Sequence, residues 1–383
     1  AYEMTLSLVG SEMCIRDSIG KEAFLGTAWY NNQSDGMVFA GKVLYGYKGV
    51  MPENTSIEIP FGTISIGNSA FYDCSNLTNV TIPNSVKYIG KRAFRNCTNI
   101  DNILIPDSVT AIGDSAFVYC TSIDNVVIPN SVTTIGENIF GHCTSLKNIT
   151  IPDSITDISY GTFSDCTNLE NIAIPDGVTN IGEYAFYGCE NLKNINIPNG
   201  VKSIKESTFN GCKSLINITI SEKVTNIGDY AFTDCESLVS LVIPNSVKKI
   251  GYRAFENCSA LETITIPNSV TSILESAFDG CKNLTIMGYK NSVAENYAKE
   301  NEINFIELIK KIITGDADEN EIVDINDVTY LQRHIAGNKN TDELPLIDES
   351  NKDVFESVDL NKDGKLDVQD VTLLQQLIAG NKE

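Results

Sequence analysis

Two stretches near the end of the chain carry oxygen-bearing side chains at matching positions. Residues 316–327 read Asp-Ala-Asp-Glu-Asn-Glu-Ile-Val-Asp-Ile-Asn-Asp, and residues 359–370 read Asp-Leu-Asn-Lys-Asp-Gly-Lys-Leu-Asp-Val-Gln-Asp. Each places a carboxylate or amide oxygen at positions 1, 3, 5, 9 and 12 of a twelve-residue loop. Calcium prefers six to eight hard oxygen ligands, and this spacing can wrap them around one ion with a backbone carbonyl at position 7. The spacing predicts calcium binding in both stretches, and the alternative is a solvated acidic surface.

Each of these loops must be held by the elements beside it. An apolar helical stretch follows each loop, beginning at Val328 and at Val371. No clear helix precedes either loop, and position 12 is Asp where an EF-hand has Glu. The duplicated loop and helix, over about residues 313–381, resemble the type I dockerin module of cellulosomal proteins. The resemblance implies a small α-helical, calcium-binding dockerin domain.

The same resemblance implies two Ca²⁺ sites, each with six ligand residues, of which the one at position 7 acts through its backbone carbonyl. The first set is Asp316, Asp318, Asn320, Ile322, Asp324 and Asp327. The second set is Asp359, Asn361, Asp363, Lys365, Asp367 and Asp370. In the first loop Glu321 stands where the sharp turn expects glycine with a positive φ. We therefore expect weaker calcium binding at the first site.

Dockerins bind the cohesin domain of a scaffold protein, so the resemblance also implies a partner. Loop positions 10 and 11, and residues one and two helical turns later, face the cohesin in that family. The corresponding residues are Ile325, Asn326, Gln332 and Arg333 in the first copy, and Val368, Gln369, Gln375 and Gln376 in the second. Because the two sets differ, the dual-orientation binding of symmetric dockerins is not expected.

Most of the chain before these loops is a repeat of 23 residues. Phenylalanine recurs at this interval from Phe71 to Phe278, and cysteine recurs from Cys74 to Cys281. The pair Ile-Pro recurs from residues 82–83 to residues 266–267 and fails only at Ile220-Ser221. A fixed period of this size is typical of a solenoid, in which each unit buries its apolar face only by stacking on its neighbours.

Within one unit, Leu77, Val80 and Ile82 have leucine-rich repeat spacing and alternate with polar residues, as a strand requires. Pro83 then ends the strand, because proline cannot donate to the ladder. The full pattern I-G-x-x-A-F-x-x-C-x-x-L-x-x-I-x-I-P-x-x-V, over roughly residues 64–306, resembles the BspA-like leucine-rich repeat family of bacterial surface and secreted proteins. The expected fold is a β-rich, right-handed solenoid with a parallel sheet.

These features divide the chain into four parts. Residues 1–18 resemble translated sequencing-adapter sequence, so we expect the native N-terminus and its export signal to be missing. Residues 19–63 are expected to form an atypical N-terminal repeat that caps the solenoid with a β-hairpin near Lys42. Residues 64–306 form the solenoid, closed by a short amphipathic helix over 292–301, and residues 307–383 form the dockerin-like domain.

Two repeated columns admit more than one interpretation. Stacked cysteines lie about 4.8 Å apart, within reach of disulfide or metal bonding, but a small buried thiol is favoured beside the phenylalanine column. The asparagines that recur from Asn79 to Asn217 predict an outward column, either a stacked amide ladder or a polar surface for glycan or protein. The neighbouring column, from Thr81 to Thr265, varies from coil to coil and is the natural place for specificity.

Carbohydrate binding would favour a continuous aromatic platform, which the tyrosine positions do not predict. Tyr184 and Tyr230 share one repeat position, and Tyr160 and Tyr252 share another. Tyr72 and Tyr187 share a third, five coils apart, or roughly 24 Å. Carbohydrate binding is therefore the less favoured interpretation.

Catalysis has little support in the sequence. The two histidines, His142 and His334, build no nucleophile-base set, and the acidic residues of the repeats are scattered rather than paired across a cleft. The formal net charge of −22 argues against nucleic acid and anionic membrane surfaces as partners. We therefore expect a non-enzymatic, monomeric protein without a membrane-inserted segment.

The sequence thus predicts a secreted, non-catalytic cellulosome-type component at the cell surface. Its dockerin would bind a scaffold cohesin in a calcium-dependent manner, and its solenoid would recognise an unidentified protein or glycan. The main alternative is a cell-surface adhesin that the dockerin only anchors. A cryptic polysaccharide-degrading enzyme is the less favoured alternative.

Overall fold

The computed structural model describes residues 23–308, 314–315, 317, 323, 325–337, 347 and 352–380. The chain divides into two compact units, one ending at Glu307 and the other beginning at Leu308. The adapter-like segment 1–18 lies outside the described residues.

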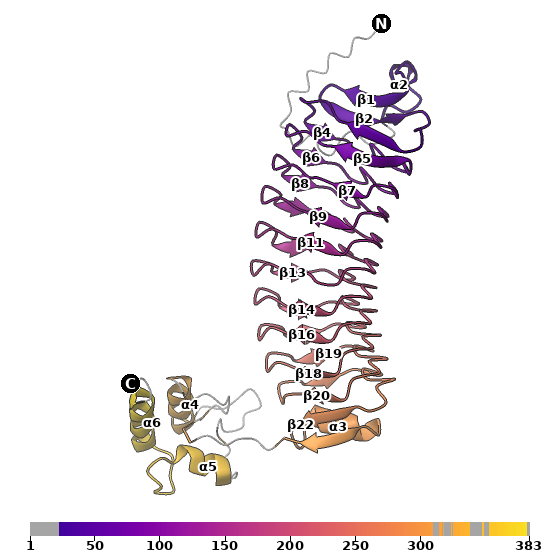
Figure 1. The fold of residues 1–383 in the computed structure, drawn as a ribbon. Helices are drawn as coiled ribbons and strands as arrows, with labels where there is room; N and C mark the ends of the chain where they lie inside the picture. The colour runs from indigo at the N-terminus through magenta and orange to yellow at the C-terminus, as the bar shows by residue number, and fades with distance from the viewer. Residues whose placement is uncertain are drawn as a thin grey trace. The chain divides into compact units, whose positions relative to one another are not determined.

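The described part of the first unit begins with a short helix and an antiparallel hairpin (Figure 1). Helix α2 spans Ala28–Asn31, and strands β1, Gly36–Ala40, and β2, Val43–Lys48, pair across a tight turn at Gly41. Gly41 has a φ of +63°, a conformation that glycine adopts without steric penalty. Strand β2 then pairs in parallel with the first repeat strand, so the hairpin covers the first coil.

Each coil of the solenoid contributes a short strand that precedes a glycine or its equivalent. We call these strands the Ile-Gly ladder, because most end in isoleucine followed by glycine. They pair in parallel with a step of 23 residues, as in Tyr88↔Ala111 and Asn226↔Lys249. The strands are β4 Ser65–Ile66, β6 Tyr88–Ile89, β8 Ala111–Ile112, β10 Thr134–Ile135, β12 Asp157–Ile158, β13 Asn180–Ile181, β15 Ser203–Ile204, β17 Asn226–Ile227, β19 Lys249–Ile250 and β21 Ser272–Ile273.

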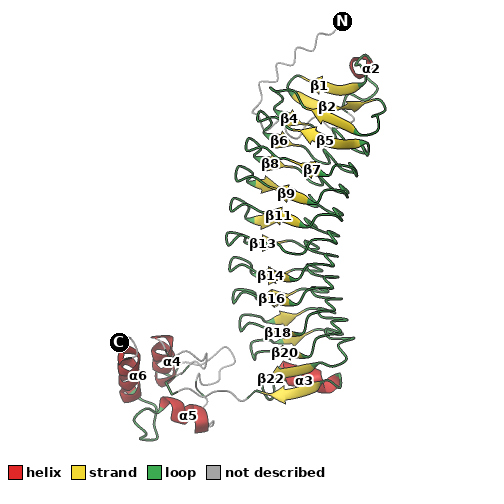
Figure 2. Cartoon of the chain, in the orientation of Figure 1, coloured by secondary structure: helices red, strands yellow, loops and turns green. Residues whose placement is uncertain are grey.

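Most coils contribute a second strand, just before the Ile-Pro motif. We call these strands the Ile-Pro ladder. They also pair in parallel, and the segment at Asn171 joins through an isolated bridge to Asn194. The strands are β3 Thr55–Glu58, β5 Leu77–Thr81, β7 Asn102–Ile103, β9 Asn125–Val127, β11 Asn148–Thr150, β14 Asn194–Asn196, β16 Asn217–Thr219, β18 Ser240–Val242 and β20 Thr263–Thr265. The predicted parallel solenoid is therefore confirmed (Figure 2).

Phenylalanine rings fill the solenoid interior. From Phe71 to Phe278 consecutive rings stack with centroids 5.1–6.0 Å apart. The isoleucines and valines of both ladders pack around them and join one continuous core. Each coil thus buries its apolar face against the next, which is why the fixed spacing in the sequence produces a regular stack.

A helix and a final strand close the far end of the solenoid. Strand β22, Thr285–Gly288, pairs with β23, Asn304–Glu307, and between them lies helix α3, Val293–Glu300. The hydroxyl of Ser292 caps this helix by accepting from the Glu295 amide at 3.2 Å. Tyr297 lies edge-on to Phe278 at 5.7 Å, so the predicted closing helix covers the last ring of the stack.

The second unit is helical in its described residues. It contains α4, Ile325–Ile335, α5, Lys352–Val358, and α6, Val368–Gly380. Its core is small and joins residues from all three helices, among them Leu331, Val358 and Leu374. The sequence between α5 and α6 is the second of the two acidic loops.

Candidate functional site

The loop over residues 359–370 folds around the carboxylate at its first position. The oxygens of Asp359 accept hydrogen bonds from the amides of Asp363, at 3.2 Å, and Gly364, at 2.9 Å. Gly364 has a φ of +82°, which explains the glycine at the sharp turn. Asp359 is buried although it is an acid, so its carboxylate is held inside the loop rather than in solvent.

The side chains at positions 3, 5 and 9 also bond to the loop backbone. Asn361 Oδ1 accepts from the Asp363 amide at 2.8 Å, and Asp363 Oδ1 accepts from the Lys365 amide at 2.9 Å. Asp367 Oδ1 accepts from the Gln369 amide at 2.7 Å. Each side chain is therefore fixed by an amide two residues further on, and only part of each oxygen set is used.

A helix precedes this loop, contrary to the expectation that neither loop has one. Helix α5 ends at Val358, and Asp359 follows directly. Seven residues are too short for a reliable 3.6-residue apolar period, so α5 was not predictable from the apolar pattern. Val354 and Val358 are buried in the small core and anchor the start of the loop. The second loop is thus part of a helix-loop-helix.

The carboxylates at position 12 make the same contact in both loops. Asp370 Oδ1 accepts from the amide of Leu360, at position 2 of its loop, at 2.8 Å. Asp327 Oδ1 accepts from the amide of Ala317, at position 2 of the first loop, also at 2.8 Å. Both aspartates are fully buried in the first turn of the following helix. The two loops therefore share the contact that draws their two ends together.

The donor set of the second loop fits a calcium ion. It offers four carboxylates, one amide oxygen and one backbone carbonyl, all hard oxygen ligands. Among the described residues, however, no three His, Cys, Asp or Glu side chains are gathered closely enough to hold a metal ion.

Of the six predicted ligands of the first loop, only Asp327 lies within the described part of the chain. Glu321 and the remaining five lie outside the described residues, namely Asp316, Asp318, Asn320, Ile322 and Asp324.

The eight residues predicted to face a cohesin are all exposed. Ile325 and Val368 occupy equivalent positions at the starts of α4 and α6, and their exposed fractions are 63% and 68%. Exposed β-branched side chains at the first positions of two helices are available to a partner surface. The other six are Asn326, Gln332, Arg333, Gln369, Gln375 and Gln376.

The outward face of the Ile-Pro ladder carries the predicted asparagine column. Asn79, Asn102 and Asn125 lie in register on consecutive strands. Asn217 Nδ2 donates to Asn194 Oδ1 at 3.0 Å, which is one link of a stacked amide ladder. Beside this column lie exposed apolar side chains, and those of Leu104 and Val242 are 76% and 68% exposed. This face combines a regular polar row with a variable apolar one.

The tyrosines form local clusters that the sequence did not predict, rather than a continuous platform. Tyr160 and Tyr184 lie 5.4 Å apart between ring centroids, and Tyr184 and Tyr187 lie 5.8 Å apart. Tyr230 and Tyr252 form a second pair at 5.4 Å. These rings come from different repeat positions, so a search along single columns could not detect them.

The cysteine column consists of free thiols, as favoured from the sequence. From Cys97 to Cys281 each Sγ donates to the carbonyl oxygen of the phenylalanine 26 residues earlier, as Cys143 does to Phe117 at 3.2 Å. Burial raises the pKa of the Cys143 thiol to about 12. A thiol that is protonated and buried is a poor nucleophile and a poor metal ligand.

The two histidines have structural contacts. His142 lies 3.1 Å from an Asp165 oxygen and stacks on Tyr119 at 4.3 Å. His334 Nδ1 accepts from the Ile347 amide at 3.1 Å.

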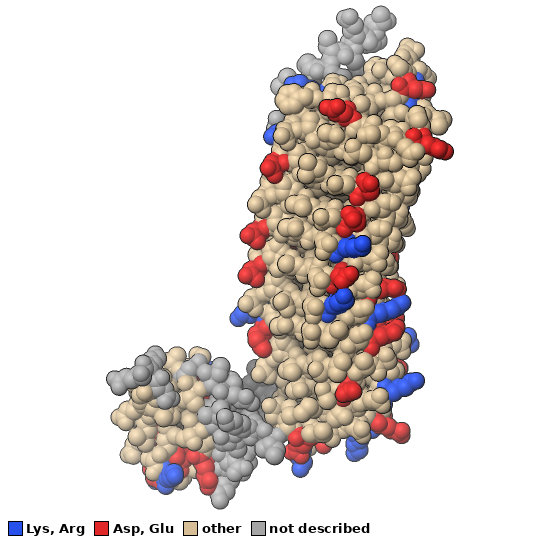
Figure 3. Space-filling model, in the orientation of Figure 1, with Lys and Arg blue, Asp and Glu red and all other residues tan. Residues whose placement is uncertain are grey.

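Figure 3 shows acidic and basic side chains dispersed over the visible face of the solenoid. In the part of the chain that the structure describes, no helix is long and apolar enough to cross a membrane.

Solved structures offer several leucine-rich repeat proteins for comparison. A T. pallidum leucine-rich repeat protein is 30% identical, and the match covers 51% of this chain and 82% of that chain, with a TM-score of 0.37. A leucine-rich cell surface protein from Faecalibacterium prausnitzii is 32% identical, with coverages of 67% and 83% and a TM-score of 0.40. The pneumococcal vaccine antigen PcpA is 18% identical, with coverages of 65% and 72% and a TM-score of 0.45.

No match was found among curated proteins. A family model described as the BspA type leucine rich repeat region, in six copies, matches residues 47–170 and 156–285. The matched span covers more than half of the chain and coincides with the stacked coils of the first unit. On this ground the chain belongs to the BspA-type leucine-rich repeat family.

Proposed function

We propose that this chain is a secreted, non-catalytic binding protein with two binding units. The helical unit binds calcium and, like a dockerin, docks on the cohesin domain of a scaffold protein. The solenoid presents a recognition surface to a protein or glycan. The observation that supports the docking role is that Asp327 and Asp370 make the same contact, each accepting from the amide at position 2 of its own loop.

Electrostatics support calcium as the ligand of the second loop. Four aspartates lie within its twelve residues, and two of them, Asp359 and Asp370, are buried. Carboxylates held together out of water repel one another, and a divalent cation removes that repulsion. Neutral backbone amides satisfy some of the oxygens, but they do not balance the charge.

The exposed start of each helix supports docking. Ile325 lies two residues before the buried Asp327, and Val368 lies two residues before the buried Asp370. An ion that fixes the loops therefore also fixes these two apolar side chains. Joining such a module to a scaffold raises the effective concentration of the solenoid at a surface, which suits weak individual contacts.

The test is binding of the full chain to a panel of cohesins, first with calcium and then with a chelator. We expect calcium-dependent binding that is lost in the double variant Ile325→Asp, Val368→Asp, while calorimetry still detects calcium binding. The matched control is Leu104→Asp, an equally exposed apolar side chain on the solenoid, which should not alter cohesin binding. Calcium binding without binding to any cohesin would refute the docking role.

A second candidate is a cell-surface adhesin that the helical unit only anchors. The exposed apolar side chains of Leu104, Val127 and Val242 on the Ile-Pro ladder favour a protein ligand for the solenoid. Binding of the full chain to arrayed host proteins, lost in Leu104→Asp but retained in the Ile325→Asp, Val368→Asp variant, would support this alternative. The opposite pattern would favour the scaffold-bound component.

A further inference from the structure

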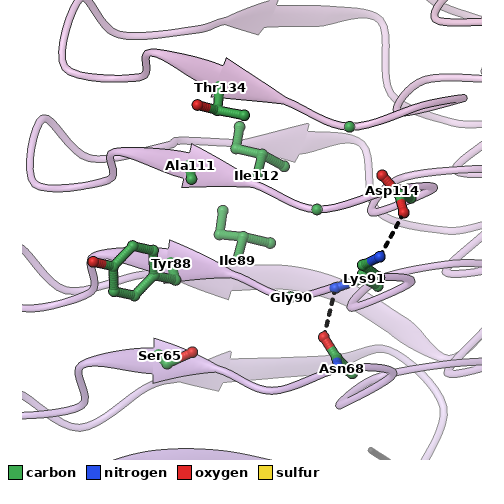
Figure 4. A pocket seen from close by; sticks show the side chains of 12 residues that line it. Ser65, Asn68, Tyr88, Ile89, Gly90, Lys91, Ala111, Ile112, Asp114 and Thr134 are labelled. Carbon is green, nitrogen blue, oxygen red and sulfur yellow. Dashed lines mark hydrogen bonds and ion pairs between the residues drawn. The ribbon is translucent and has the colours of Figure 1, made fainter. Parts of the chain in front are cut away.

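A hollow of about 370 Å³ lies on the Ile-Gly ladder, on a different sheet from the variable face discussed above. It spans strands β4, β6, β8 and β10 (Figure 4). Figure 4 shows Tyr88 and Ala111 in a row along one side of the hollow, and Lys91 and Asp114 along the other. Its volume lies in the lower part of the range of small-ligand sites.

Glycines line the hollow between the two rows. A Cβ atom at Gly90 would lie 2.7 Å from the Asn68 amide nitrogen, and one at Gly113 would lie 2.7 Å from the Lys91 amide nitrogen. At Gly90 and Gly113 the backbone lies directly against the backbone of the preceding coil, and these glycines place no side chain between the two rows. The glycine column is interrupted at Ser159, one coil after the last glycine that lines the hollow, and resumes at Gly182.

The polar groups of the hollow are matched in charge. Lys91 Nζ lies 2.9 Å from Asp114 Oδ2, so the site presents both a donor and an acceptor with no net charge between them. An anionic ligand would meet Asp114 and the overall charge of −22, and a cationic ligand would meet Lys91. These groups fit a neutral ligand rich in hydroxyl groups.

Tyr88 supplies an aromatic surface to the hollow. It is the only aromatic residue in its column, whose other members are Ser65, Ala111, Thr134, Asp157, Asn180, Ser203, Asn226, Lys249 and Ser272. Lys91 is likewise the only basic residue in its own column, from Asn68 to Glu275. Both exceptions fall in the same coil and line the same hollow.

We propose that this hollow binds a short stretch of a neutral glycan. A sugar ring has a face of C–H groups that packs on the Tyr88 ring, while its hydroxyls bond to Lys91, Asp114 and Asn68. The inference rests on the proposed role of the solenoid as a recognition surface. It assigns the glycan to the Ile-Gly ladder, separate from any protein bound by the Ile-Pro ladder.

The test is calorimetric titration of the full chain with neutral tetrasaccharides of glucose, xylose, mannose and galactose, and with an acidic tetrasaccharide of galacturonate. We expect at least one neutral probe to bind and the acidic probe not to bind. Tyr88→Ala should weaken binding about tenfold, by removing the stacking surface. Ala111→Phe should also weaken it, by filling the hollow, and Tyr88→Phe should retain it.

The matched control is Tyr187→Ala, which removes an exposed tyrosine that does not line the hollow and should leave glycan affinity unchanged. Failure of all neutral probes, preference for the acidic probe, or equal affinity of the wild type, Tyr88→Ala and Ala111→Phe would each overturn the proposal. Cohesin binding is measured on the same samples. Its loss alone would refute the docking function and leave the glycan site standing, and loss of glycan binding alone would do the reverse.

Discussion

A single phenylalanine per coil determines how well the solenoid core is filled. Phe163 is fully buried and stacks on Phe140 at 6.0 Å and on Phe186 at 5.5 Å. Phe163→Ala should lower the free energy of unfolding by about 3–5 kcal/mol, because it removes the ring and leaves a cavity between two neighbours. Phe163→Leu should have a clearly smaller effect, since it keeps most of the volume. Urea unfolding followed by circular dichroism measures both, and equal losses would contradict a packed stack.

The thiols make the solenoid sensitive to alkaline pH. Burial raises the pKa of Cys143 from its ordinary value of 9.0 to about 12, so the unfolded chain releases this proton first. Between these values the folded state binds more protons, and stability falls as pH rises. The loss from Cys143 should reach about 1.4 kcal/mol for each pH unit between 9 and 12. Below pH 9 the contribution is fully present.

Urea unfolding at pH 7.5, 9.0 and 10.0, with reductant, measures this dependence. Cys143→Ala is the matched variant, and its stability should fall less between pH 9.0 and 10.0 than that of the wild type. Identical slopes for the two proteins would show that Cys143 does not contribute.

Contacts between residues of the same repeat column can be predicted from the sequence, whereas contacts between different columns cannot. The phenylalanine and cysteine columns were predictable because each residue meets its own copy one period away. The contact between Tyr160 and Tyr184 was not, since the two residues are 24 positions apart and belong to different columns. The hollow beside Tyr88 was missed for a related reason, because it is lined by residues of different columns, such as Tyr88 and Lys91.

At the scale of the elements, helix α3 covers the C-terminal end of the solenoid core. It buries Ala294, Tyr297 and Ala298 against the last coil, and Tyr297 covers Phe278. Tyr297→Ala should lower the thermal unfolding temperature and increase end-to-end association, because it exposes the final ring of the core. Lys299→Ala, an exposed site on the same helix, serves as the control. Thermal melts and light scattering measure the two effects, and equal behaviour of the variants would contradict a capping role.

Elements differed in how far the sequence predicted them. Helix α3 was predictable from its apolar spacing and its serine cap, and the segment after each acidic loop from its apolar run. Helix α5 was missed because it is a short helix of seven residues and contributes only a few buried residues, such as Val354 and Val358. The calcium ligands of the 359–370 loop stay a prediction, whereas the amides that bond to their side chains were seen only in the structure.

The whole chain combines a large repetitive core with a small second core. The solenoid core runs without interruption from Leu44 to Ala298, whereas the described core of the helical unit contains eight buried residues. Domains below about 70–80 residues often need an additional constraint such as a metal ion. A bound calcium ion stabilises the folded unit by mass action, so it should matter far more to this unit than to the solenoid.

Calcium removal should therefore separate the unfolding of the two units. In differential scanning calorimetry of the full chain, a chelator should shift one transition to lower temperature and leave the solenoid transition unchanged. Asp370→Ala should abolish the calcium-dependent shift, because it removes a ligand and the contact to the Leu360 amide. Asp279→Ala, in the last solenoid coil, is the matched control and should retain the shift. A chelator effect on both transitions, or on neither, would contradict a calcium site confined to the helical unit.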